Sequence, residues 1–217
     1  MMMVEKILLI VGAGPGISLS TAKKFGSNGF KVALISRSKE SLQKYELELK
    51  NDGIDATGFP GDATSEESLA TAIDGVIKMY GRIDVLLYNA YAGNRGKPTT
   101  LSAEQLMEDF KVSVAGALTS VKLVLPHMEN GAILLTGGGL ALRPVANYSS
   151  VAIGKAGIRS LAYSLHQELK PAGIYVGTLT IKGFVKEGTY FSPENIANAF
   201  YSMYENQDET EILFEQT

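Results

Sequence analysis

The feature that most constrains this chain is a glycine-rich turn between an apolar run and an amphipathic helix. The run is Ile7–Val11, and the helix extends through Phe25. Such a turn after the first strand of a βαβ unit places backbone N–H groups where a pyrophosphate binds, although glycine turns also occur for steric reasons alone. We therefore predict a dinucleotide-binding turn. Its residues are Gly12, Gly14, Pro15, Gly16 and Ile17.

Further short apolar runs recur along the chain and alternate with helical segments. Unalternating runs of this kind are typical of strands covered on both faces. The pattern predicts an α/β fold: one Rossmann-type domain over residues 1–217, with a doubly wound parallel sheet in three α/β/α layers. The runs are Val32–Ile35, Ala56–Phe59, Val85–Tyr88, Ala132–Leu135 and Ile174–Leu179, with Glu211–Phe214 as the last strand.

Several helix ends are also marked. Ser65, followed by two glutamates, predicts a helix start, and Gly81 predicts the end of that helix. A later helix is expected from Ser192 to about Tyr204. Glycines follow the other helices, where a left-handed residue can satisfy the last carbonyls. They are Gly29, Gly53, Gly131 and Gly173.

Composition excludes several classes of function. Lys and Arg number 20 against 23 Asp and Glu, so the net charge of -3 disfavours nucleic acid as a partner. The chain has no cysteine, and His127 and His166 are far apart, so we predict no metal site. Met1–Met3 leads into the first strand without the basic segment and cleavage site of a secretory signal. No apolar run reaches ~20 residues, so we expect a cytoplasmic protein without a membrane partner.

The second predicted strand ends in Ser36 and Arg37, where an NAD-selective fold carries an acidic residue for the ribose hydroxyls. A guanidinium can instead donate several charge-assisted hydrogen bonds to a 2′-phosphate. We predict that NADP(H) is preferred over NAD(H). The alternative is that Arg37 is a solvated residue at a helix start.

These landmarks resemble the short-chain dehydrogenase/reductase family over nearly the whole chain. Gly12-x-x-x-Gly16-x-Ser18 is similar to that family's glycine motif. The resemblance implies that Asp62, followed by Ala63, binds the adenine amino group. It also places Asn89 and Ala90 in the family's Asn-Asn-Ala-Gly segment beside the cofactor. The family's last glycine there is replaced by Tyr91, which narrows the pocket.

The catalytic residues are where the sequence departs from the family. The resemblance implies that Lys155 holds the nicotinamide ribose. Val151 then stands at the position of the catalytic Tyr, Gly138 at that of the Ser, and Ser113 at that of the Asn. Neither Val nor Gly can supply a side-chain proton or hydrogen bond. We therefore expect little carbonyl reductase or alcohol dehydrogenase activity by the family's usual mechanism.

Another tyrosine could replace the missing proton donor. Tyr148 precedes Lys155 by two helical turns, a rise of about 11 Å that argues against direct contact. Tyr91 and Tyr190 border the cleft, where an aromatic residue is more often a packing wall than a base. Candidate catalytic residues are thus Lys155, Tyr148 and Ser113. A short lid is expected around residues 183–192 to cover a small-molecule substrate.

Two functions follow from these residues. The first is an oxidoreductase that reduces a small carbonyl or enone by an atypical mechanism, because hydride transfer belongs to the cofactor. The second is an inactive cofactor-binding relative that acts as a redox sensor or assembly partner. The resemblance also implies a homodimer or homotetramer that pairs through helices over about Ser102–Leu123 and Val151–Leu169. Small residues there would allow close helix contact. They are Ala115, Gly116, Ala117, Ala156 and Gly157.

Overall fold

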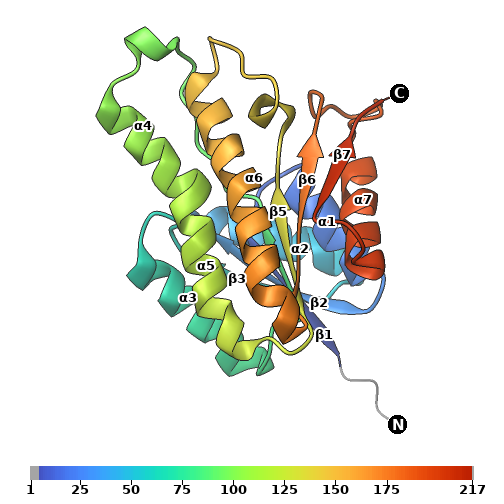
Figure 1. Ribbon diagram of the computed structural model, residues 1–217. Coiled ribbons are helices and arrows are strands. Elements are labelled where there is room, and N and C mark those ends of the chain that lie inside the picture. The colour runs from blue at the N-terminus through green and yellow to red at the C-terminus, as the bar shows by residue number, and fades with distance from the viewer. Residues whose placement is uncertain (1–4, 217) are drawn as a thin grey trace.

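A computed structural model describes residues 5–216 and contains a seven-stranded parallel sheet between two layers of helices (Figure 1). The strand order is β3-β2-β1-β4-β5-β6-β7, which confirms the doubly wound Rossmann-type prediction. Met1–Met3 lies outside the described residues. The strands are β1 (Lys6–Val11), β2 (Phe30–Ser36), β3 (Ala56–Pro60), β4 (Val85–Tyr88), β5 (Ala132–Thr136), β6 (Tyr175–Ile181) and β7 (Glu211–Phe214).

The helices lie on both faces of the sheet and cover the apolar strands from either side (Figure 1). They are α1 (Ile17–Gly26), α2 (Lys39–Asn51), α3 (Glu66–Tyr80), α4 (Ala103–Phe110), α5 (Gly116–Val124), α6 (Ser149–Leu169) and α7 (Pro193–Asn206). Shorter turns of helix are η1 (Pro98–Thr100), η2 (Lys111–Ala115), η3 (Leu125–His127), η4 (Gly139–Ala141) and η5 (Lys170–Ala172). None of the described helices is long and apolar enough to cross a membrane.

Two apolar cores hold the layers together because successive strand residues point to opposite faces. In β1, Leu9 and Val11 pack with residues of α3, α5 and α6. Leu8 and Ile10 pack with residues of α1, α2 and α7. All of these β1 side chains are buried, whichever face they point to. The strand is therefore apolar throughout, without alternation of apolar and polar residues.

The predicted helix ends are mostly confirmed. Gly81 ends α3 in a left-handed conformation with φ 76°, and Gly29, Gly53 and Gly173 also have positive φ. The prediction for Gly131 is wrong, because Asn130 adopts the left-handed conformation instead, with φ 50°. Gly131 is required for close packing: a Cβ there would lie 2.9 Å from the Asp84 carbonyl oxygen.

The single helix predicted over about Ser102–Leu123 is interrupted by the π-helical turn η2 between α4 and α5. Within it, the Val112 carbonyl accepts a hydrogen bond from the Tyr88 hydroxyl. The side chain of Ser113 is turned inward and buried. Single π turns of this kind often occur at functional sites.

The small residues expected to face a second subunit are mainly used within this chain. Gly116 and Ala117 are buried, and Gly157 packs against Val114 and Phe110. These three residues therefore serve packing within the chain, and the pairing of subunits stays a prediction. Among the five small residues, Ala115 and Ala156 are the exposed ones.

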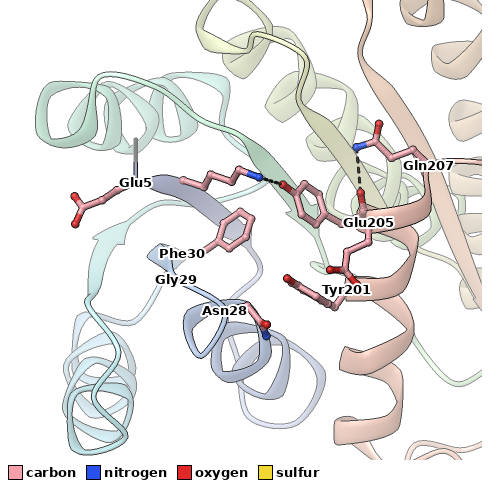
Figure 2. A pocket seen from close by; sticks show the side chains of 9 residues that line it. Glu5, Asn28, Gly29, Phe30, Tyr201, Glu205 and Gln207 are labelled. Atoms are coloured by element: carbon pink, nitrogen blue, oxygen red, sulfur yellow. Dashed lines mark hydrogen bonds between the residues drawn. The ribbon is translucent and has the colours of Figure 1, made fainter. Parts of the chain in front are cut away.

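A hollow lies at the amino end of β1, the end of the strand away from the glycine turn (Figure 2). Lys6 Nζ donates a hydrogen bond to the Tyr204 hydroxyl at 2.7 Å and lies 5.8 Å from the centroid of the Phe30 ring. Phe25 packs edge-on against both Phe30 and Tyr201. These contacts join α7 to α1 and β2, so we assign the hollow to packing between elements.

Candidate functional site

The site lies at the carboxyl ends of β1 and β4, which are neighbours in the sheet although their following helices cover opposite faces. A crevice opens at such a switch point, and ligands of doubly wound sheets bind there. The glycine turn follows β1, and Asn89 with Ala90 follows β4. The fold thus brings these two predicted segments together.

Direct packing connects the two segments. Gly12 has φ 88°, and a Cβ there would overlap the backbone of Ala90. Asn89 Nδ2 donates to Ser18 Oγ at 2.8 Å, and that hydroxyl donates to the Gly12 carbonyl, also at 2.8 Å. Asn89 and Ala90 therefore fix the shape of the glycine turn.

The start of α1 can bind an anion. Gly16 precedes the helix with φ 81°, and no side chain caps the first amide N–H groups. A Cβ at Gly14 would meet no atom within 4 Å, so the turn leaves space in front of these groups. By contrast, α2, α3, α4 and α7 each begin with a serine whose hydroxyl accepts a backbone N–H. The residues therefore fit the pyrophosphate of a dinucleotide.

Arg37 and Asp62 lie at the carboxyl ends of β2 and β3, beside the glycine turn. Arg37 is exposed and forms no ion pair within residues 5–216, and Ser36 is partly buried beside it. The Thr64 backbone N–H lowers the pKa of the Asp62 carboxyl, and the charge of Arg37 adds to this effect. Ala63 is partly buried next to Asp62. The edge therefore offers a guanidinium and an ionised carboxylate.

Lys155 lies on α6 and reaches the end of β5. Its Nζ donates to the Thr136 carbonyl at 2.7 Å. Burial lowers the pKa of Lys155 to about 8. A Cβ on Gly138 would lie 3.3–3.4 Å from the side-chain carbons of Lys155, so the residue at the family's Ser position contacts Lys155 but has no hydroxyl.

Thr136 was not singled out from the sequence. Its hydroxyl oxygen is the buried side-chain polar atom without a hydrogen-bond partner in the described part of the chain. A buried hydroxyl normally has a partner, and the backbone carbonyl of the same residue accepts from the Lys155 amine. No residue pattern distinguished Thr136 from other strand-end threonines.

The loop after β4 covers the position of the absent catalytic tyrosine. The Ser113 hydroxyl accepts from the Ala92 N–H and donates to the Ala92 carbonyl, both at 3.1 Å. A Cβ at Gly93 would overlap the side chain of Val151. Two residues at altered family positions, Ser113 and Val151, thus hold this loop.

Buried polar groups fix the rest of the loop. The Asp109 carboxylate accepts from the Asn94 backbone N–H at 3.0 Å and from the Ser150 hydroxyl. Farther along, Ser149 Oγ donates to the Gly96 carbonyl at 3.0 Å. The loop is therefore tied both to α4 and to the start of α6.

The candidate tyrosines take different places. Tyr148 precedes α6 and lies with its ring 5.5 Å from the Arg95 guanidinium carbon; no hydrogen bond joins it to Lys155 among the described residues. The ring of Tyr190 stacks on Phe214 with centroids 4.8 Å apart. Tyr91 is 63% exposed, and its ring centroid lies 5.4 Å from Lys155 Nζ. Tyr91 was expected to be a packing wall, and its pairing with Lys155 was not predicted.

The predicted lid around residues 183–192 is an irregular segment between β6 and α7. Its base is packed, since Phe191 fills the space above Gly183 and contacts Phe214. Its first apolar residues are open to solvent: Phe184 is 88% exposed, and Val185 is also exposed. The segment thus presents apolar side chains that a ligand could cover.

Known proteins resemble this chain in sequence and in fold. A family profile described as short chain dehydrogenase matches residues 6–189. The 7alpha-hydroxysteroid dehydrogenase of Bacteroides fragilis is 32% identical over 150 residues, 68% of this chain and 56% of that protein. An uncharacterized oxidoreductase of Staphylococcus epidermidis is 25% identical over 207 residues, 90% of this chain and 89% of its own.

Solved structures agree with the fold. A variant of actinorhodin polyketide ketoreductase with NADPH superposes with a TM-score of 0.90 at 22% identity, covering 96% of this chain and 95% of that one. A metagenomic short-chain oxidoreductase in complex with NADP gives 0.88 at 23% identity, covering 99% and 98%. Since the family profile spans most of the sequence, this chain belongs to the short-chain dehydrogenase family of oxidoreductases.

Proposed function

We propose that this protein is an NADP(H)-dependent oxidoreductase that reduces a small carbonyl or enone without the family's usual tyrosine. The observation that carries the proposal is the uncapped start of α1 at the glycine turn, with the exposed guanidinium of Arg37 near the same crevice. Two similar solved structures, described with NADPH and with NADP, support the choice of cofactor.

The chain's own residues divide the work of holding the cofactor. Backbone N–H groups at Gly16 and Ile17 bind the pyrophosphate, and Arg37 with Ser36 binds the 2′-phosphate. Asp62 accepts from the adenine amino group, and Lys155 donates to the hydroxyls of the nicotinamide ribose. When bound, the nicotinamide supplies a hydride for reduction of the substrate.

Arg37→Ala tests the cofactor preference. A charge-assisted hydrogen bond is worth about 1.5–3 kcal/mol, so we expect a roughly 10- to 100-fold weaker affinity for NADPH and an unchanged affinity for NADH. Titration calorimetry with both cofactors measures this. Lys50→Ala is the matched control, because it removes an exposed charge from the far end of α2. Equal affinities of the unmodified protein for NADPH and NADH would contradict the proposal.

A second function is favoured by Gly138 and Val151, which lack any donor. It is a cofactor-binding protein without turnover that serves as a redox sensor or assembly partner. NADPH oxidation with a panel of aldehydes, ketones and enones distinguishes the two functions. We also propose a homodimer or homotetramer and a cytoplasmic location, which light scattering and cell fractionation test.

A further inference from the structure

We propose that Tyr91 is the proton donor of this site and that Lys155 is its charged partner. The tyrosine and lysine of the reaction would thus come from two segments, the loop after β4 and the helix α6, and not from one helix. This inference rests on the proposed reductase function. It assigns the proton donor that the proposed reductase would otherwise lack, because position 151 is a valine.

The first support is the position of the Tyr91 ring. Its centroid lies 5.4 Å from Lys155 Nζ, within the range in which a cation is attracted to an aromatic face. Lys155 is itself held by the Thr136 carbonyl at 2.7 Å. The Tyr91 ring therefore lies against a lysine that is held at the carboxyl end of β5.

The second support is that the loop is placed by the residues that replaced the family's own. Ser113 holds both polar groups of Ala92, the residue after Tyr91. The Val151 side chain packs directly against Gly93. A tyrosine side chain at position 151 would need the space that Gly93 occupies. The changes at 91, 113 and 151 therefore act together to bring a phenol toward Lys155 from the loop.

The third support is that the loop is rigid enough to hold a catalytic group. The buried Asp109 carboxylate accepts from the backbone and the side chain of Asn94 and from the Ser150 hydroxyl. A group on a loop tied at several points keeps the position that proton transfer requires.

The other tyrosines near the cleft are already engaged. Tyr88 is buried and donates to the Val112 carbonyl. Tyr190 stacks on Phe214, and Tyr148 lies against Arg95. Tyr91 is the tyrosine whose ring pairs with Lys155.

The proton balance is simple. During reduction the Tyr91 O–H bond breaks, and its proton passes to the carbonyl oxygen of the substrate. A bound reduced nicotinamide would supply the hydride to the carbonyl carbon and become oxidised, so the product would be an alcohol. The Tyr91 phenolate, stabilised by Lys155, regains a proton from water, which its 63% exposure permits. No further oxidant or reductant is needed.

Tyr91→Phe tests the assignment because it keeps the ring and removes only the hydroxyl. We expect turnover of a reducible carbonyl to fall about 100-fold or more, the usual effect of losing a general acid, with NADPH affinity unchanged. Tyr201→Phe is the matched control: it removes a tyrosine hydroxyl at the hollow by the amino end of β1, far from the site, and should leave turnover unchanged.

The outcomes separate the two proposals. If the unmodified protein binds NADPH but oxidises it with no carbonyl, the reductase function fails and the donor role fails with it. If it turns over and Tyr91→Phe is equally active, only the Tyr91 assignment is overturned.

Discussion

The two sides of the cleft are built in different ways. On the nucleotide side, between β1 and β3, the glycine turn and the start of α1 act through backbone N–H groups. On the reaction side, the residues at positions 138 and 151 lack the family's chemistry, and the loop after β4 packs against Val151. The comparison indicates that a site made of backbone keeps its form, whereas a site made of side chains from separate segments can be rebuilt.

The reason is physical. A phosphate site at a helix start needs one backbone path and residues without side chains, and few sequences provide both. A proton donor needs only a phenol near a lysine, which more than one segment of the fold can supply. The loop from Tyr91 to Gly96 shows such a replacement route, because its anchors lie on other segments: Ser113 belongs to η2 and Asp109 to α4.

The largest expected effect tests the nucleotide side. Gly12→Ala should destabilise the protein by about 3 kcal/mol or more and abolish NADPH binding, because the new methyl group meets the Ala90 backbone and φ is 88°. Urea unfolding and calorimetric titration measure both effects. Gly14→Ala is the control: its Cβ would meet nothing within 4 Å, so stability should change by about 0.5 kcal/mol or less. Equal losses of stability in the two variants would show that the shape of the turn does not depend specifically on Gly12.

The next effect tests the reaction side. Val151→Tyr restores the family's residue but should cost about 1–3 kcal/mol, because Gly93 already fills the space beside Val151. Thermal unfolding measures this cost. Ile153→Tyr introduces the same side chain at an exposed position of α6 and should change stability by about 0.5 kcal/mol or less. If Val151→Tyr is as stable as the parent, the loop is not packed closely against α6.

Most of the fold could be predicted because its signals are local. Each buried strand is a run of apolar residues, and several helices begin with serine or end at glycine. Gly131 misled this reading, because a glycine after a helix can serve close packing, here against Asp84, as well as a left-handed turn. The π turn at Lys111–Ala115 had no local signal, since it depends on the buried Tyr88 hydroxyl meeting a helix carbonyl.

The site was only partly predictable, because some of its contacts join residues that are far apart in the sequence. The glycine turn was found from residues near one another in sequence, and the role of Lys155 was implied by the family resemblance. The pairing of Tyr91 with Lys155 joins residues from two segments and depends on how Val151 and Gly93 pack. Its one sequence signal was a tyrosine in place of the family's glycine. Spacing along α6 pointed instead to Tyr148, which lies against Arg95.

The smallest expected effect concerns Lys155, which lies where the two sides meet. Burial lowers its pKa to about 8 in the folded protein, against an ordinary value of about 10.4. Between these values the unfolded chain binds more protons, so stability without cofactor should rise with pH, at less than about 1.4 kcal/mol per pH unit. Lys155→Met should be more stable than the parent at about pH 7, and this advantage should shrink by about pH 9.5. Urea unfolding at both pH values measures it, with Lys50→Met as the exposed control; an advantage that stays constant would mean that burial does not set the charge of Lys155.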